Sequence, residues 1–435
     1  MKKNEEYLLE CTGLSDQGYG IGHIQGMTIF AANLLPGEKA RVRIIKPAAR
    51  YAIARVMERM NDSAIRTQPR CPHAASCGGC SFLHVRYEDQ LKWKHEQLDH
   101  LFSSLPQKPD VRPVLGMEDP FYYRNKAQFP IAVENGKIIS GFYRPRTNTI
   151  VDIEDCAIQS ERINEVYRWI KKHLPVKAAE NLRHLFIRDS EKMKQMQVVF
   201  IGRSDAHLKE FTKKLTERFP EIVSVVFNEN TRDDNVILGE KYHVLYGSDS
   251  LLEDCLGLKI RLHFKSFFQV NPQQMEVLYS TALKMADLKK TDHVVELYSG
   301  TGTIGLLAAR EAASVEGVEI VPEAVKNAQE NAALNHITNA KFVCQDASAF
   351  AAEYQGQADV LIVDPPRKGL SPQGITDIVR IHPKRIVYVS CNPRTLQRDL
   401  VLLEEQGYVC PVIQPVDMFS HTSGVECIAL LEQKK

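Results

Sequence analysis

Short apolar runs alternate with segments of helical periodicity from Phe267 to the end of the chain. The runs are strand-length, as in HVVEL, DVLIV and RIVYV, and stretches such as PEAVKNAQENAALN place apolar residues on one face of a helix between them. Strands that alternate with helices predict a doubly wound, largely parallel sheet, so we expect an α/β fold here. Ligands of such sheets bind at the carboxyl ends of the strands.

The rest of the chain shows two other patterns. Residues 1–60 consist of short alternating segments separated by turns such as GYGIG and LPGE, which predicts a β-barrel of about five strands. Tyr87–Phe102 places apolar residues at helical spacing and predicts a helix. Beyond it, β-like runs mix with helical segments and indicate an α+β domain. We therefore expect three domains: a barrel at 1–60, a central domain at 61–265 and an α/β domain at 266–435.

Composition narrows the class of protein. The chain is 44% hydrophobic and 25% charged, and no apolar run approaches the roughly 18 residues that a membrane helix needs. The N-terminus, MKKNEEYLLECTG, lacks the apolar stretch of a secretory signal. We expect a cytoplasmic protein with no membrane partner. The ten cysteines are then expected to be thiols or metal ligands rather than disulfides.

Charge is unevenly distributed along the chain. The net charge is only +1, which excludes a protein that is basic over its whole surface. However, Lys39–Arg70 carries nine basic and two acidic side chains, a local net charge of +7. Such a stretch suits contact with the phosphates of a nucleic acid. A solvated face of a small β domain explains the same charge equally well.

A glycine-rich turn follows the first strand of the α/β part. Gly300, Gly302 and Gly305 have G-x-G-x-x-G spacing directly after HVVEL, and Glu319 closes the next strand. The glycines permit a tight turn against a nucleotide, and the carboxylate can accept both ribose hydroxyls. This pattern fits NAD and S-adenosylmethionine alike. Glu296 ahead of the turn and the polar loop VDPPRKG favour the methyl donor.

Four cysteines are candidate metal ligands. Cys71, Cys77 and Cys80 are grouped in CPHAASCGGC, and Cys156 follows in VDIEDC. Four thiolates can close a zinc site or hold an iron–sulfur cluster. One short knuckle with a distant fourth cysteine favours a cluster, with zinc and unligated thiols as the alternatives. The long interval between Cys71 and Cys77 opposes the three-cysteine motif of radical S-adenosylmethionine chemistry.

Cys391 is the candidate nucleophile. It closes the strand RIVYVS and precedes Pro393 at the expected start of a helix, where the helix dipole stabilises a thiolate. A thiolate beside a methyl donor suits C5 of uracil, because its addition to C6 makes C5 nucleophilic. A base must then remove the C5 proton. Glu426 is the candidate, although its position alone is more typical of a solvated strand-end carboxylate.

Together these motifs resemble the RNA (uracil-5-)-methyltransferase family along the whole chain. After the barrel, the landmarks are CPHAASCGGC, FYYRNKAQFP, GFYRPRTNTIVDIEDC, SFFQVNPQQ, ELYSGTGTIGL, VDPPRKGL, VSCNPRTLQRDL and DMFSHTSGVECIALL. The resemblance implies an N-terminal TRAM domain and a Rossmann-like class I S-adenosylmethionine-dependent methyltransferase domain. The chain is most similar to the bacterial branch that acts on 23S ribosomal RNA, since the transfer-RNA branch lacks the TRAM domain and the cysteine motif.

The resemblance also implies roles for individual residues. Cys391 is then the nucleophile and Glu426 the base, although the match is weakest near Ser420, where many relatives have proline. The cluster is of the [4Fe-4S] type, held by Cys71, Cys77, Cys80 and Cys156. S-adenosylmethionine is bound by Gln269, Tyr298, Gly300, Gly302, Glu319 and Asp364.

Two other functions fit parts of the sequence. The DPP of VDPPRKG is similar to the loop of amino-group methyltransferases, but Arg367 stands where these have an aromatic residue. That chemistry also has no use for Cys391. An iron–sulfur RNA-binding protein without catalysis is the second alternative, and the intact glycine loop argues against it.

RNA contact is expected from the front half of the molecule. The basic run can bind phosphates, and exposed aromatic side chains can stack on bases that are flipped out of an RNA. Nothing indicates an obligate protein partner, so we expect a monomer. The aromatic residues expected to stack are Phe121, Tyr122, Tyr123, Phe142 and Tyr143.

Overall fold

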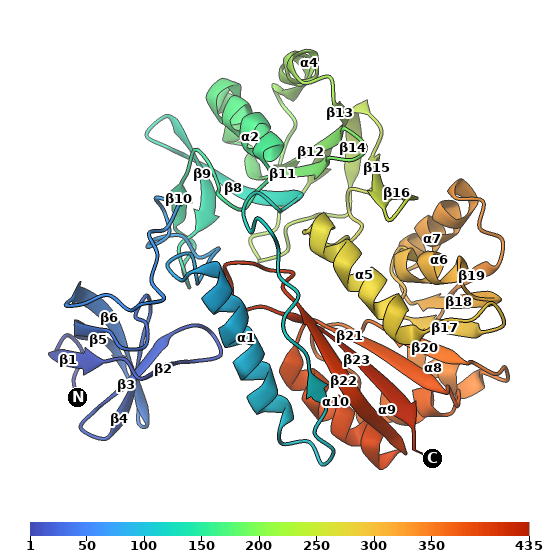
Figure 1. The fold of residues 1–435 in the computed structure, drawn as a ribbon. Coiled ribbons are helices and arrows are strands. Elements are labelled where there is room, and N and C mark those ends of the chain that lie inside the picture. The colour runs from blue at the N-terminus through green and yellow to red at the C-terminus, as the bar shows by residue number, and fades with distance from the viewer. Residues whose placement is uncertain (435) are drawn as a thin grey trace.

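A computed structural model describes residues 1–434, and its C-terminal part is built on an eight-stranded sheet (Figure 1). The strand order is β19-β18-β17-β20-β21-β23-β22-β7. Neighbours from β19 to β21 are parallel, whereas β23 is antiparallel to both β21 and β22. The strands are β7 (Asp110–Val111), β17 (His293–Leu297), β18 (Ser314–Glu319), β19 (Ala340–Cys344), β20 (Val360–Val363), β21 (Arg385–Ser390), β22 (Tyr408–Val416) and β23 (Glu426–Gln433).

Apolar side chains are buried on both faces of this sheet. Val294 and Val295 are consecutive in β17, yet they belong to separate hydrophobic cores on opposite faces. One face is covered by α5 (Pro272–Ala286), α6 (Thr303–Ala309), α7 (Pro322–Leu334) and the hairpin of β15 (Ser250–Cys255) and β16 (Leu258–His263). The other is covered by α1 (Tyr87–Phe102), α8 (Ala347–Glu353), α9 (Pro372–Val379) and α10 (Pro393–Glu405). The expected doubly wound α/β fold is confirmed.

The N-terminal barrel has six strands where about five were expected. Their order is β1-β5-β6-β4-β3-β2. The sheet closes because one chain segment supplies both of its ends: β1 pairs with β5, and β2 directly after it pairs with β3. The strands are β1 (Glu6–Glu10), β2 (Gly13–Leu14), β3 (Gly20–Ile24), β4 (Met27–Ala31), β5 (Lys39–Pro47) and β6 (Tyr51–Arg59).

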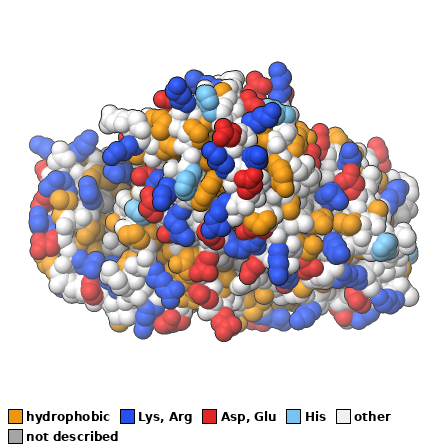
Figure 2. All heavy atoms as spheres, turned by 90° about the horizontal axis from the view of Figure 1, so that it is seen from above, with side chains coloured by type: hydrophobic (Ala, Val, Ile, Leu, Met, Phe, Trp, Pro, Cys, Tyr) orange, Lys and Arg blue, Asp and Glu red, His pale blue; other side chains and the backbone are white. Residues whose placement is uncertain are grey.

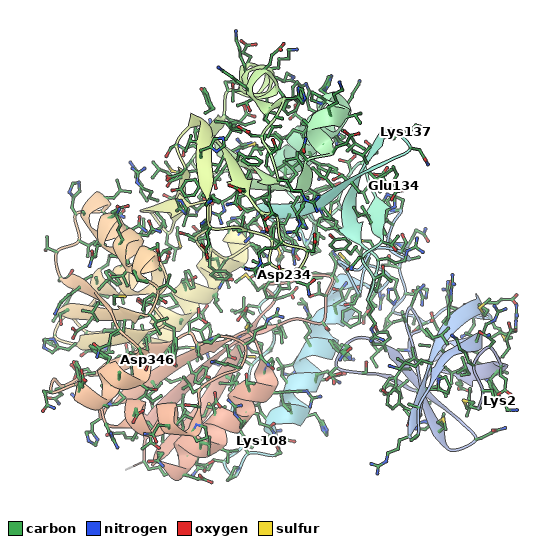
Figure 3. The ribbon with its side chains drawn as sticks, turned by 180° about the vertical axis from the view of Figure 1, so that it is seen from behind. Lys2, Lys108, Glu134, Lys137, Asp234 and Asp346 are labelled. Atoms are coloured by element: carbon green, nitrogen blue, oxygen red, sulfur yellow. The ribbon has the colours of Figure 1, made fainter. Side chains whose placement is uncertain are left out.

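The middle of the chain forms a seven-stranded sheet in the order β10-β9-β8-β11-β12-β13-β14. Glu134 and Lys137 mark the tip of the β8–β9 hairpin, which projects from it (Figure 3). Helices α2 (Glu161–His173), α3 (Val176–Ala179) and α4 (Leu208–Arg218) contribute to its main core. The strands are β8 (Lys126–Glu134), β9 (Lys137–Tyr143), β10 (Ile150–Asp152), β11 (Leu182–Ser190), β12 (Gln195–Gly202), β13 (Ile222–Glu229) and β14 (Tyr242–Gly247).

Helix α1 and strand β7 link the front of the chain to the C-terminal sheet. The helix has the bounds that its apolar spacing predicts, and Leu98 and Phe102 enter the core beneath α10. Strand β7 adds to the sheet edge in parallel with β22. In Figure 1, α1 therefore lies between the barrel and the C-terminal sheet. Both elements come from the range 61–265, so the C-terminal sheet is completed by residues from outside 266–435.

The surface is mixed in charge. On the face seen from above, basic and acidic side chains are interspersed (Figure 2), in line with a net charge of +1. Within residues 1–434 we find no helix that is both long enough and apolar enough to cross a membrane.

Candidate active site

The glycine loop lies between β17 and α6, at the carboxyl end of the sheet. Tyr298, Gly300 and Gly302 all have positive φ, at 64°, 54° and 78°. At Gly302 a Cβ atom would lie 2.7 Å from the ring of Phe342, so only glycine fits. The backbone N–H of Gly300 donates to Oε2 of Glu319 at 3.0 Å. Glu319 thus braces the turn, and its oxygens keep lone pairs for further hydroxyl donors.

Two carboxyl groups lie beside this loop, the buried Glu296 and the half-buried Asp364. Burial and the charge of Asp364 raise the pKa of Glu296 to about 8, and Oε2 of Glu296 has no hydrogen-bond partner within residues 1–434. Burial raises the pKa of Asp364, directly after β20, to about 7. An unpaired buried acceptor such as Oε2 of Glu296 suits a polar or cationic ligand.

Gln269 lies with these carboxyl groups. Its side chain is buried. Burial and the charge of Asp364 raise the pKa of Tyr279, and a hydrogen bond from the Gln269 side chain opposes that rise. The structure therefore brings Gln269, Glu296 and Asp364 together near Tyr279.

Cys391 and Glu426 are brought together by strand pairing. In the antiparallel pair of β21 and β23, Ser390 lies opposite Cys427. Extending this register by one residue sets Cys391 against Glu426, although the two are distant in sequence. Asn392 follows as the N-cap of α10, and its Oδ1 accepts from the N–H of Arg394 at 3.2 Å.

The free thiol is less acidic than its helix position predicts. Burial and the charge of Glu426 raise the pKa of Cys391, while Arg367 opposes the rise. The expected stabilisation of the thiolate by α10 is therefore outweighed by its neighbours. An unpaired thiolate here is costly until a substrate or a cation compensates for it.

Glu426 is buried, unlike the solvated strand-end carboxylate that its sequence position suggests. Its relative exposure is 3%. Burial and the charge of Asp364 raise the pKa of Glu426 to about 8, again opposed by Arg367. In its ionised form, a carboxylate with a raised pKa is a stronger base than an ordinary one and takes up a proton from carbon more readily.

Arg367 also belongs to this site, although no sequence motif assigns it a role there. Its carbonyl oxygen accepts hydrogen bonds from the Asn392 side chain at 3.0 Å and from the Thr395 hydroxyl at 3.3 Å. Its charge lowers the pKa of both Cys391 and Glu426. The available signal was its place directly after the strand-end DPP.

A groove of about 1020 Å³ leads to Cys391. It is formed by a barrel loop, helix α1, the loop after β20, the start of α10 and the connection from β22 to β23. Segments that are far apart in sequence thus share one opening. Its lining includes Asp16, Gln17, Trp93, Arg124, Arg367, Cys391, Arg394, Phe419 and Gly424.

The other four candidate cysteines share a second, smaller cavity of about 110 Å³. Its remaining lining is mainly apolar, with Leu83, Phe142 and Ile158, and Arg124 lines both cavities. Burial and the neighbouring thiolates raise the pKa of Cys80 and, to about 11, that of Cys156. This donor set fits a cationic iron–sulfur group that would compensate the thiolate charges. Among residues 1–434, no three acidic, histidine or cysteine side chains converge on a single metal ion.

The expected aromatic RNA contacts are only partly exposed. Tyr122 and Tyr143 have relative exposures of 42% and 40%. Tyr123 is buried and donates to the carbonyl oxygen of Ser420 at 3.0 Å. Phe142 packs on Phe129 and lines the cysteine cavity. For Tyr123 and Phe142 the expectation of an exposed stacking surface is wrong, because the central core and the β22–β23 connection cover them.

Comparison with known proteins agrees with this architecture. The family model "tRNA (Uracil-5-)-methyltransferase" matches residues 86–434, and the TRAM domain model matches residues 2–57. Relatives named "Uncharacterized RNA methyltransferase" from Bacillus cereus and Clostridium tetani are 41% and 40% identical, each over 99% of this chain and over 98% and 97% of their own lengths.

A solved structure is similar over nearly the whole molecule. It is the Pyrococcus abyssi tRNA (uracil-54, C5)-methyltransferase in complex with S-adenosyl-L-homocysteine, 26% identical, with a TM-score of 0.78. The match covers 98% of this chain and 99% of that one, so it includes the barrel. The chain therefore belongs to the tRNA (uracil-5-)-methyltransferase family, as an S-adenosylmethionine-dependent RNA methyltransferase with an N-terminal TRAM domain.

Proposed function

We propose that this enzyme methylates C5 of a uridine in 23S ribosomal RNA through a covalent bond between Cys391 and C6. The observation that carries the proposal is the β21–β23 register, which brings the thiol to a buried carboxyl group whose pKa is raised by Asp364. An amino-group methyltransferase would need neither Cys391 nor a base paired with it.

The reaction follows from these groups. The Cys391 thiolate adds to C6, and the electron pair of the C5–C6 double bond becomes an enolate. C5 then attacks the methyl group of the donor, whose carbon–sulfur bond breaks to leave S-adenosylhomocysteine. Glu426 removes the C5 proton, the double bond re-forms, and the thiolate leaves C6. Arg367 offsets the negative charge that these steps bring together.

In this proposal the methyl donor binds at the carboxyl edge of the sheet, next to the glycine loop. Glu319 accepts from the ribose hydroxyls, and the glycines let the backbone approach the donor closely. Asp364 is shared between the donor side and the uracil side, because its charge acts on both Glu296 and Glu426. The contact residues in this proposal are Gln269, Tyr298, Gly300, Gly302, Glu319 and Asp364.

The second cysteine site has a separate task in this proposal. Cys71, Cys77, Cys80 and Cys156 would hold a [4Fe-4S] cluster, supported by their position on one mainly apolar cavity. When bound, the cluster would crosslink two distant segments of the central region and give the fold rigidity rather than chemistry. No catalytic step uses these residues.

The RNA-binding surface would span all three domains. The barrel at 1–60 and the central domain at 61–265 bind RNA, and the domain at 266–435 carries out catalysis. A cytoplasmic ribosomal substrate is consistent with this division. Transfer RNA is the second candidate substrate, because the similar Pyrococcus abyssi enzyme is named for tRNA and aligns with the barrel as well. A barrel therefore does not by itself exclude tRNA.

A trapping experiment tests the proposal. RNA that carries 5-fluorouridine has no C5 proton to lose, so the enzyme and methyl donor should form a stable protein–RNA adduct with 23S rRNA. Cys391→Ala should form none, whereas Cys344→Ala, an exposed thiol elsewhere, should behave as the native enzyme does. Adducts with tRNA alone would replace the rRNA assignment. Methylation without any adduct would refute the covalent mechanism.

A further inference from the structure

A buried ion pair outside the reacting groups joins α1 to the β22–β23 connection. Nζ of Lys94 lies 2.5 Å from Oδ1 of Asp417, and neither side chain has any solvent exposure. The proposed reaction uses neither residue. Replacing a buried pair by apolar side chains often leaves a protein as stable, so overall stability alone does not account for it.

The Lys94 ammonium group bonds residues near both ends of the β22–β23 connection. Besides Asp417, Lys94 donates to the carbonyl oxygen of Gly424 at 2.7 Å and to that of Phe419 at 3.4 Å. Gly424 stands two residues before Glu426. Residues 417–425 have no strand or helix of their own, so the direction in which this segment enters β23 depends on such contacts.

The Asp417 carboxylate is held in turn by two hydroxyl groups. Tyr87 on α1 donates to its Oδ2 at 2.6 Å, and Ser420 donates to the same oxygen at 2.8 Å. The Tyr87 oxygen also accepts from the N–H of Met117 at 2.9 Å. Apart from the Ser420 bond, which lies within the connection, the side-chain bonds of the pair run between α1 and the segment that precedes Glu426.

We propose that Lys94, through Asp417 and Gly424, is a positioning residue that aims the Glu426 carboxyl group at the C5 proton. The inference rests on the proposed function and assigns a task to a residue that does not touch the reacting atoms. Cys391 is positioned separately, by β21 and the Asn392 cap of α10. Loss of the pair should therefore slow one step only.

The affected step is the last one. Addition of the thiol to C6 and methyl transfer to C5 should proceed, and the adduct should wait for removal of the C5 proton. Breakage of the C5–H bond supplies the electron pair that restores the C5–C6 double bond and expels the Cys391 thiolate. A misaimed Glu426 leaves the methylated adduct intact, so the adduct should accumulate on ordinary uridine.

The test uses the full-length enzyme with RNA that carries uridine or uridine deuterated at C5. In Lys94→Met/Asp417→Asn, which removes both charges together, kcat should fall about a hundredfold with little change in KM for RNA. The adduct with unmodified uridine should become detectable, and deuterium should slow turnover more than in the native enzyme. Tyr87→Phe, a milder change, should show the same signature with a smaller loss.

Lys92→Met is the matched control, because Lys92 lies on the exposed side of the same helix and should leave every measurement unchanged. The positioning role is overturned if folded variants lose turnover without adduct accumulation and without a larger isotope effect. If the double variant does not fold, Tyr87→Phe decides by the same two readouts. A native enzyme that forms no 5-fluorouridine adduct would instead refute the proposed function, and the positioning role with it.

Discussion

Two sets of cysteines in this molecule have opposite surroundings. The four thiols of Cys71, Cys77, Cys80 and Cys156 line a small, mainly apolar cavity. Cys391 opens onto a groove about nine times larger, 1020 against 110 Å³, with Arg367 beside it and Glu426 behind it. Burial raises the pKa of a thiol in both places, that of Cys80 in the first and that of Cys391 in the second.

The difference lies in what can compensate a thiolate. In the quartet the nearest charges include other thiolates, so ionisation of one opposes ionisation of the next. An added cationic group relieves all of them at once. At Cys391 the protein supplies a cation and a carboxyl group, and the groove admits a substrate. The two groups of cysteines thus differ in their neighbours rather than in their burial.

The largest effect on this contrast should come from breaking the quartet. Cys77→Ala should lose bound iron and lower the free energy of unfolding by about 3 kcal/mol, since loss of a metal site is among the costliest substitutions. RNA affinity should fall with it. Iron and sulfide analysis, urea unfolding and RNA binding measure these three effects, with Cys344→Ala as the control. Normal folding and RNA binding by Cys77→Ala would show that the four cysteines are not needed to stabilise the fold or to bind RNA.

A smaller effect should come from the carboxyl group behind Cys391. Glu426 has a folded-state pKa of about 8 against 4.5 in the unfolded chain, so the unfolded state binds fewer protons between these pH values. Protonated Glu426 favours the folded state. Its contribution to the free energy of unfolding is complete below pH 4.5 and is lost as the pH rises to about 8. Glu426→Gln does not titrate, so its stability relative to the native protein should rise by roughly 2.5 kcal/mol from pH 5 to pH 7.

Urea unfolding at the two pH values measures this change. Glu432→Gln is the matched control, because Glu432 is exposed near the other end of the same strand and should shift stability equally at both. A flat difference for Glu426→Gln would mean that Glu426 is not held neutral by its surroundings.

The smallest effect should come from Arg367. Arg367→Gln removes the charge that lowers the pKa of Cys391, so less thiolate is present at neutral pH. Adduct formation with 5-fluorouridine RNA should slow about tenfold at pH 7 and recover at higher pH, since one pKa unit is a tenfold change in thiolate. Lys368→Gln, the adjacent change, should leave the pH profile in place. An unchanged profile in Arg367→Gln, with weaker RNA binding instead, would make Arg367 a phosphate ligand.

Local sequence patterns predicted much of this architecture. They did not predict which strands distant in sequence would pair. The bounds of α1 follow from its apolar spacing, and the positive φ of Gly300 and Gly302 agrees with the turn expected from the glycine motif. The neighbourhood of Cys391 and Glu426 depends on β23 inserting between β21 and β22, which no local spacing encodes. The burial of Tyr123 depends on the same insertion, because its hydroxyl bonds the connection that precedes β23.

The position of α1 also has a consequence for how the protein is made. Tyr87 and Asp417, which are hydrogen-bonded, are 330 residues apart in sequence, so a ribosome needs on the order of half a minute to produce the second after the first. Until then α1 lacks the partner that buries Lys94, and β7 lacks the strand that it joins. The segment that leads into Glu426 is thus synthesised well after α1, and the earlier helix is what receives it. A chain released before that point would have its donor loop but neither the buried pair nor Glu426.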